Sequence, residues 1–127
     1  MQIIDTHNHI YLPEFDDDRA EVIRRSVDAG VRFIMMPNID SGSVAPMHAA
    51  AERFQGICLP MMGLHPTSVK ENYLDELKMV EMLLRKHRYW GIGETGIDLY
   101  WDKTFITEQK LSFRHHLELA EEYELPV

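Results

Sequence analysis

Apolar and polar residues change period along the chain, from the alternation of strands to the spacing of helices and back again. Short apolar runs rich in β-forming residues predict buried strands, and apolar residues three and four positions apart predict amphipathic helices. The predicted strands cover residues 2–6, 31–36, 57–62 and 89–93, and the predicted helices cover residues 17–29, 43–54, 74–87 and 107–123.

Strand and helix therefore alternate four times, and Leu125-Pro126-Val127 begins a fifth extended segment. This order is typical of right-handed crossovers and a parallel sheet, in which chemistry gathers at the C-terminal strand ends. Three of these ends carry polar residues that suit chemistry, namely His7 and His9, then His65, then Glu94. Because these strand ends share one edge of the sheet, the pattern predicts a functional site there.

His7 and His9 follow the first strand and are predicted to lie on one face of it, about 7 Å apart at strand spacing. Two imidazoles in this arrangement form half of a metal site, although they could equally be hydrogen-bonded residues at a strand end. Asp5 has the parity to lie deeper on the same face, and a role as a polar floor residue fits it about as well. Since Cys58 is the single cysteine, a metal here would take imidazole and carboxylate ligands.

Composition narrows the class of protein. The chain has 127 residues, which suits one domain, and its 45% apolar and 27% charged residues are ordinary for a globular protein. A net charge of −8 argues against a broad electrostatic footprint for nucleic acid, so a phosphodiester would need bound cations or a local basic rim. The absence of a membrane-length apolar run and of a signal peptide predicts a cytoplasmic protein without a membrane partner.

Several sequence blocks agree with one family. They are Asp5-Thr6-His7-Asn8-His9, Gly63-Leu64-His65-Pro66, the run from Gly91 to Tyr100, and the stretch from Gln109 to Val127. In order and spacing they resemble the TatD family of metal-dependent deoxyribonucleases. The resemblance implies an α/β fold of the (β/α)8 TIM-barrel type, in the amidohydrolase-like superfamily. Residues 1–127 would then be the N-terminal half of one hydrolase domain, with four βα units and the start of strand five.

The resemblance also implies the chemistry. It assigns hydrolysis of DNA phosphodiester bonds to two divalent metal ions, with Mg²⁺ expected for activity and Zn²⁺ or Mn²⁺ as alternatives. Carried over to this sequence, the metal ligands are His7, His9 and Glu94, and Glu94 is also catalytic because it bridges both ions. His65 is expected to contact the substrate. One departure is Tyr11, which stands where family members often have an acidic residue.

Length is the second departure, since a complete barrel has about 250 residues. The family's remaining ligands would lie beyond Val127, so we expect the 127-residue chain to be inactive alone and to self-associate through its open half-barrel. Two alternatives stay open. The substrate could be a small phosphoester or an amide, or the chain could be a non-catalytic truncated or split product that must associate with another chain.

Aromatic and histidine residues late in the chain are less specific. Tyr100 and Trp101 are expected to pack against the barrel rim, with stacking on a base as the alternative. His115 and His116 lie in the middle of the last predicted helix, where a solvated or intersubunit surface is expected.

Overall fold

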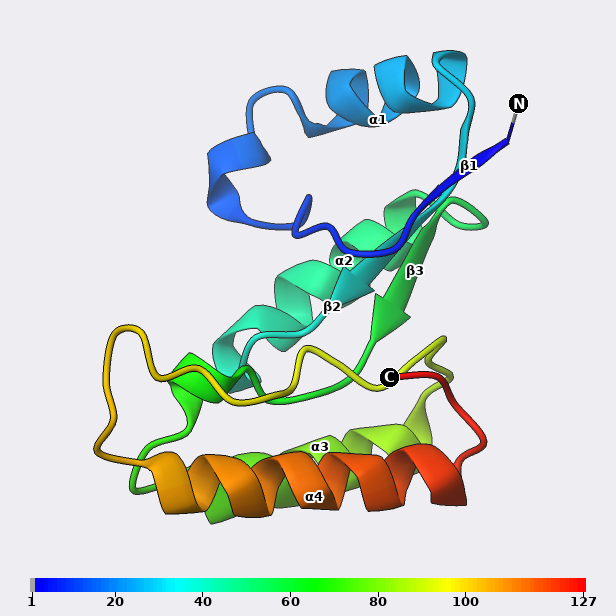
Figure 1. Cartoon of the computed structure of the whole chain (residues 1–127). Helices are drawn as coiled ribbons and strands as arrows, with labels where there is room; N and C mark the ends of the chain where they lie inside the picture. Colours follow the sequence, from blue (N-terminus) through cyan, green and yellow to red (C-terminus); the bar gives the residue numbers. More distant parts are fainter. Residues whose placement is uncertain (1) are drawn as a thin grey trace.

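The structure, a computed structural model, describes residues 2–127 and is an open, partial barrel of the α/β class (Figure 1). Its sheet has three parallel strands in the order β1-β2-β3, and helices connect successive strands. The strands are β1 (Ile3–Asp5), β2 (Val31–Pro37) and β3 (Cys58–Met61), the helices are α1 (Arg19–Asp28), α2 (Val44–Arg53), α3 (Tyr73–Lys86) and α4 (Ile106–Glu122), and short 3-10 turns are η1 (Pro13–Phe15), η2 (Ser41–Ser43) and η3 (Pro66–Ser68).

The fourth predicted strand, 89–93, is present as an extended segment but not as a full strand. It forms one parallel bridge to the sheet, between Met62 and Ile92. The amide of Trp90 also donates to the carbonyl oxygen of Pro60 at 2.9 Å. Proline has no N–H to donate in return, so the ladder cannot continue evenly on this side. The sequence therefore placed the segment correctly and overestimated the regularity of its pairing.

Glycine is required where this fourth segment crosses the end of β3. A Cβ atom on Gly63 would lie 2.7 Å from the carbonyl carbon of Gly93 and 2.9 Å from the carbonyl oxygen of Glu94. At Gly91 the nearest atom to an added Cβ is the flexible end of the Met61 side chain, which can move aside, so the requirement for glycine falls on Gly63. The bare backbones can therefore approach closely, and this approach carries Glu94 to the edge of the sheet where β1 and β2 end.

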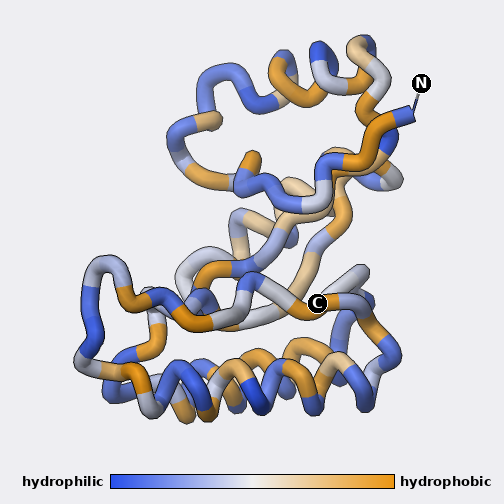
Figure 2. Tube along the Cα trace, in the orientation of Figure 1, coloured by the Kyte–Doolittle hydropathy of each residue, from blue (hydrophilic) through white to orange (hydrophobic). Residues whose placement is uncertain are grey.

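Helices α3 and α4 lie side by side beneath the sheet, and both alternate polar and apolar residues along their length (Figures 1 and 2). On α3 the buried residues are apolar. On α4 they include polar residues as well, because Gln109, Ser112 and His116 face inward while Leu117 is exposed. Polar groups can occupy this face because Gln109 and His116 hydrogen-bond to main-chain atoms of neighbouring loops.

The expectation for His116 was therefore wrong. Its side chain is fully buried, Nδ1 lies 2.7 Å from the carbonyl oxygen of Ser112, and Nε2 accepts from the amide of Leu64 at 3.0 Å. His115 is half-buried and lies 2.9 Å from the carboxylate of Glu81.

Within residues 2–127, no helix combines the length and the apolar character that a membrane crossing requires.

Candidate metal centre

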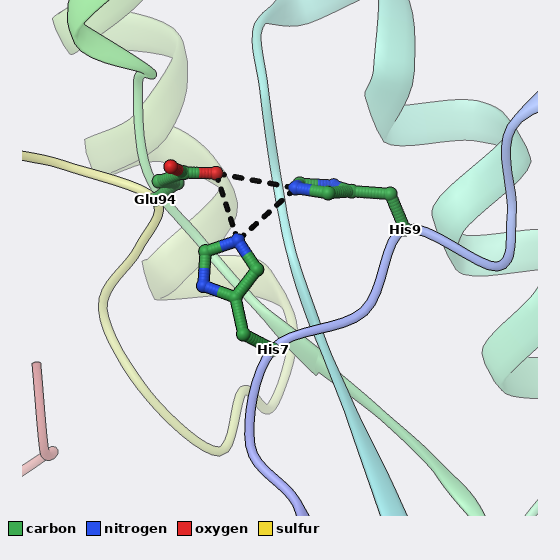
Figure 3. A group of neighbouring side chains, drawn as sticks. All are labelled: His7, His9 and Glu94. Carbon is green, nitrogen blue, oxygen red and sulfur yellow. Dashed lines mark hydrogen bonds and ion pairs between the residues drawn. The ribbon is translucent and has the colours of Figure 1, made fainter.

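Three side chains converge at the C-terminal edge of the sheet. His7 Nε2 lies 3.0 Å from Glu94 Oε2, His9 Nε2 lies 3.2 Å from the same oxygen, and the two imidazole nitrogens are 3.2 Å apart. Figure 3 shows the three groups pointing toward one another from two segments that are far apart in sequence. The residues chosen from the sequence as metal ligands are thus brought together.

The two histidines lie beyond β1 rather than on it. The strand ends at Asp5, whose carboxylate accepts from the amide of His7 at 3.2 Å and from Asn8 Nδ2 at 2.8 Å. The chain bends here, and the two imidazole rings meet edge to face with centroids 5.1 Å apart. A bend after β1, and not the alternation of a straight strand, brings the two imidazoles together, and Asp5 braces this turn instead of reaching into the site.

Glu94 is held by the end of β2. Its amide donates to the carbonyl oxygen of Asn38 at 2.9 Å, and the amide of Asn38 donates to the carbonyl oxygen of Gly93 at 3.0 Å. The Asn38 side chain is fully buried and donates to the carbonyl oxygen of Gly63 at 2.9 Å. Asn38 therefore links three strand ends, a role that the sequence analysis missed. Its position as the polar residue directly after β2 was the available signal.

A tyrosine fixes the proton of His9. The Tyr11 hydroxyl lies 2.6 Å from the carbonyl oxygen of Pro37, which can only accept, so the hydroxyl donates there. The hydroxyl oxygen of Tyr11 is also 2.8 Å from His9 Nδ1, and it must accept a hydrogen bond from this nitrogen because its own proton is already donated to Pro37. His9 therefore carries its proton on Nδ1 and presents the lone pair of Nε2 to the cluster. Burial raises the pKa of Tyr11 well above its usual value, so the phenol stays protonated.

His65 meets the other oxygen of Glu94. Its Nε2 lies 3.2 Å from Oε1, on the carboxylate atom that the first two histidines do not contact. Its Nδ1 accepts from the amide of Thr67 at 3.1 Å, so the proton lies on Nε2. His65 is thus an N–H donor at the site. This arrangement suits a contact to an anionic oxygen and does not offer a lone pair to a cation.

The donor set of His7, His9 and Glu94 fits a divalent cation. Their ligand atoms all lie within 4.8 Å of one another. Atoms about 2.1 Å from one ion lie about 3.0 Å apart in octahedral and about 3.4 Å apart in tetrahedral coordination, which brackets the separations measured here. Burial lowers the pKa of His9 below its ordinary value. The negative charge of the Glu94 carboxylate raises this pKa, but the effect of burial is larger. A neutral imidazole is the form that binds metal.

Comparison with known proteins identifies the family. The model of the TatD related DNase family matches residues 4–127. The chain belongs to this family. Its membership confirms the resemblance read from the sequence blocks, and with it the barrel-type α/β fold.

Three relatives show how far the similarity extends. The chain is 30% identical to "Uncharacterized metal-dependent hydrolase YjjV" of Escherichia coli, covering 99% of this chain and 49% of that protein. It is 30% identical to "Deoxyribonuclease TATDN3" of Homo sapiens, covering 98% and 50%. It is 28% identical to "3'-5' ssDNA/RNA exonuclease TatD" of Pantoea vagans, covering 90% and 44%.

The crystal structure of Escherichia coli YjjV superposes with a TM-score of 0.88 at 31% identity, over 98% of this chain and 49% of that one. The chain thus spans about half the length of the relatives it matches. The structural match confirms that the observed sheet and helices are part of a barrel fold. The roles of His7, His9, His65 and Glu94 remain predictions, supported by their geometry.

Proposed function

We propose that this chain provides one metal-binding edge of a hydrolase that cleaves phosphodiester bonds in DNA. The observation that carries the proposal is the convergence of His7, His9 and Glu94 at 3.0 to 3.2 Å in a chain of the TatD family. The human and Pantoea relatives are named as nucleases, which favours nucleic acid over other substrates.

The three residues would hold a divalent cation through His7 Nε2, His9 Nε2 and Glu94 Oε2. A second cation would use the other carboxylate oxygen, Oε1, which faces His65 Nε2 at 3.2 Å and would have to exchange that contact for the ion. Divalent cations held by these residues would supply Lewis-acid polarisation of a phosphoryl oxygen. His65, protonated on Nε2, would then donate to a non-bridging oxygen of the phosphate and orient it. Mg²⁺ is the proposed activating ion, with Zn²⁺ or Mn²⁺ as alternatives. The proposal that DNA is the substrate depends on the same assignment of His7, His9 and Glu94 as metal ligands.

The test is a nuclease assay on a protein of the relatives' full length that carries this chain. Divalent-dependent cleavage of a single-stranded oligonucleotide should fall by at least about a hundredfold on Glu94→Ala. The matched control is Glu81→Ala, because Glu81 also faces an imidazole, on the outer surface of α3. Equal cleavage by Glu94→Ala and the parent protein would overturn the assignment. Faster hydrolysis of a small phosphoester or an amide than of DNA would favour the rival hydrolase function.

For the 127-residue chain alone, we propose that it is catalytically inert and self-associates. The support is the edge position of β1 in the described three-stranded sheet, together with the exposure of Ile3 and Ile4 on that strand. Association with a different chain is the non-catalytic alternative. The cytoplasmic location expected from the sequence stays a prediction.

A further inference from the structure

A cavity opens beside the candidate metal centre. It has a volume of about 360 Å³ and shares His65 with the centre, since the imidazole lines the cavity while its Nε2 faces Glu94. Its other walls come from η3 and the residues just after it, from the loop between Glu94 and α4, and from the first turn of α4. Figure 1 shows η3 and this loop near each other. The principal residues around it are His65, Lys70, Asp98, Trp101, Phe105 and Gln109.

Two aromatic side chains on this loop are exposed. Tyr100 is 83% exposed and Trp101 is 78% exposed, so they do not pack against the barrel rim as the sequence analysis expected. Their rings meet edge to face at 4.7 Å, which leaves ring faces uncovered. On the facing wall, the ammonium of Lys70 lies 5.3 Å from the centre of the Phe105 ring. Of the two exposed rings, Trp101 lines the cavity and Tyr100 packs against Trp101, so the exposed aromatic surface gathers at the cavity mouth, as at a ligand-binding surface.

The polar groups of the cavity are largely satisfied by each other. Gln109 exchanges hydrogen bonds with the amide and the carbonyl of Asp98, at 2.8 Å and 3.0 Å. Lys70 pairs with Asp102 at 3.1 Å. The cavity therefore offers aromatic faces rather than unused donors and acceptors. Two carboxylates against one ammonium also make it unfavourable for a phosphate and acceptable for an uncharged group.

We propose that this cavity binds the nucleobase of the nucleotide whose phosphate faces His65, by stacking on Trp101. The proposal rests on the proposed function, because it concerns the nucleotide whose phosphate would be held at the metal centre. Stacking on an aromatic ring tolerates any base and requires an unpaired one, so the cavity favours a single strand or a frayed end. It also explains how an acidic protein can bind nucleic acid, since base stacking needs no basic surface.

The two tryptophans of the chain allow a direct test by fluorescence. In the Trp90→Phe variant, Trp101 is the only indole. A short oligothymidylate, added with EDTA so that no cleavage occurs, should quench it in a saturable way. The matching oligomer of abasic sites carries the same phosphates and should not. In the Trp101→Phe variant, the remaining reporter is Trp90, which does not line the cavity and should be unaffected.

Affinity gives the second readout. Trp101→Ala should weaken binding of the labelled oligothymidylate about tenfold, whereas Trp90→Phe should leave it unchanged. Equal quenching by the abasic oligomer, or equal affinity of Trp101→Ala and the parent, would overturn the proposal. Neither readout needs a metal or catalysis. In a protein of the relatives' full length that carries this chain, quenching without nuclease activity would therefore refute the proposed function alone, and nuclease activity without quenching would refute the stacking cavity alone.

Discussion

His9 and His65 approach the same carboxylate in opposite tautomers. His9 donates a hydrogen bond from its Nδ1–H to the Tyr11 hydroxyl and turns the lone pair of Nε2 toward Glu94. His65 accepts a hydrogen bond from the amide of Thr67 at Nδ1 and turns its Nε2–H toward Glu94. The partners on the far side of each ring thus decide its chemistry: one imidazole is prepared to bind a cation and the other to donate to an anion.

Tyr11→Phe should weaken binding of Zn²⁺ or Co²⁺ to the chain by about tenfold or more, because the proton on His9 Nδ1 loses its acceptor. The ring remains to fill its buried position, so the thermal midpoint should change little by comparison. Isothermal titration calorimetry measures the affinity. Tyr89→Phe is the matched control, since Tyr89 is also buried and its hydroxyl lies 2.7 Å from His48, away from the site. Equal affinities of the Tyr11→Phe variant and the parent would contradict the tautomer argument.

Asn38→Ala should lower the free energy of unfolding by about 2 to 3 kcal/mol, because it leaves the buried carbonyl of Gly63 and the hydroxyl of Ser43 without their partner. It should also weaken metal binding, since Asn38 orders the strand ends that carry Glu94. Denaturant titration measures the first effect and calorimetry the second. Asn72→Ala, at an exposed position before α3, serves as the control and should change neither.

Protonation of His116 should make the protein less stable in mild acid. Burial lowers the pKa of His116 to about 4, with His115 adding a smaller effect in the same direction. In the unfolded chain the group titrates near its ordinary pKa of about 6.5, so the unfolded state binds more protons between these values. Stability should therefore be full above about pH 6.5 and fall as the pH drops toward 4, by up to about 3 kcal/mol.

Denaturant titrations at pH 7 and pH 4.5 measure this loss. His116→Gln should reduce the difference between the two pH values, although it lowers stability at both, and His115→Gln should leave most of it in place. Burial lowers the pKa of His9 and His48 as well, so some pH dependence should persist in every variant. An unchanged difference in the His116→Gln protein would mean that another group is responsible.

Self-association of the chain should depend on β1. Ile4 is 54% exposed on this edge strand, and Ile4→Lys should shift the chain toward a monomer, because a charge on an edge strand opposes pairing with another sheet. Light scattering during size-exclusion chromatography measures the mass. Leu74→Lys is the control, since Leu74 is 56% exposed on α3. A parent chain that is already monomeric, or equal masses for Ile4→Lys and Leu74→Lys, would show that β1 is not the interface.

The order of elements, the parallel sheet and the residues that gather at its C-terminal edge could be predicted from local sequence patterns. Periodicity is local and follows from side chains three to four residues apart in helices and two apart in strands, so the helix and strand positions needed no tertiary information. The rule that parallel strands present their C-terminal ends together was enough to group His7, His9, His65 and Glu94.

Which atoms of these residues meet, and which ring nitrogen of each histidine carries the proton, depends on the folded chain. The tautomers of His9 and His65 depend on Tyr11, Pro37 and Thr67, whose hydrogen bonds form only when the loops fold over the strand ends. The inward face of α4 was likewise invisible to hydrophobic periodicity, because His116 is buried through long-range hydrogen bonds and not through apolar character. Periodicity records which side chains avoid water, and it carries no information about polar groups that are satisfied by distant parts of the chain.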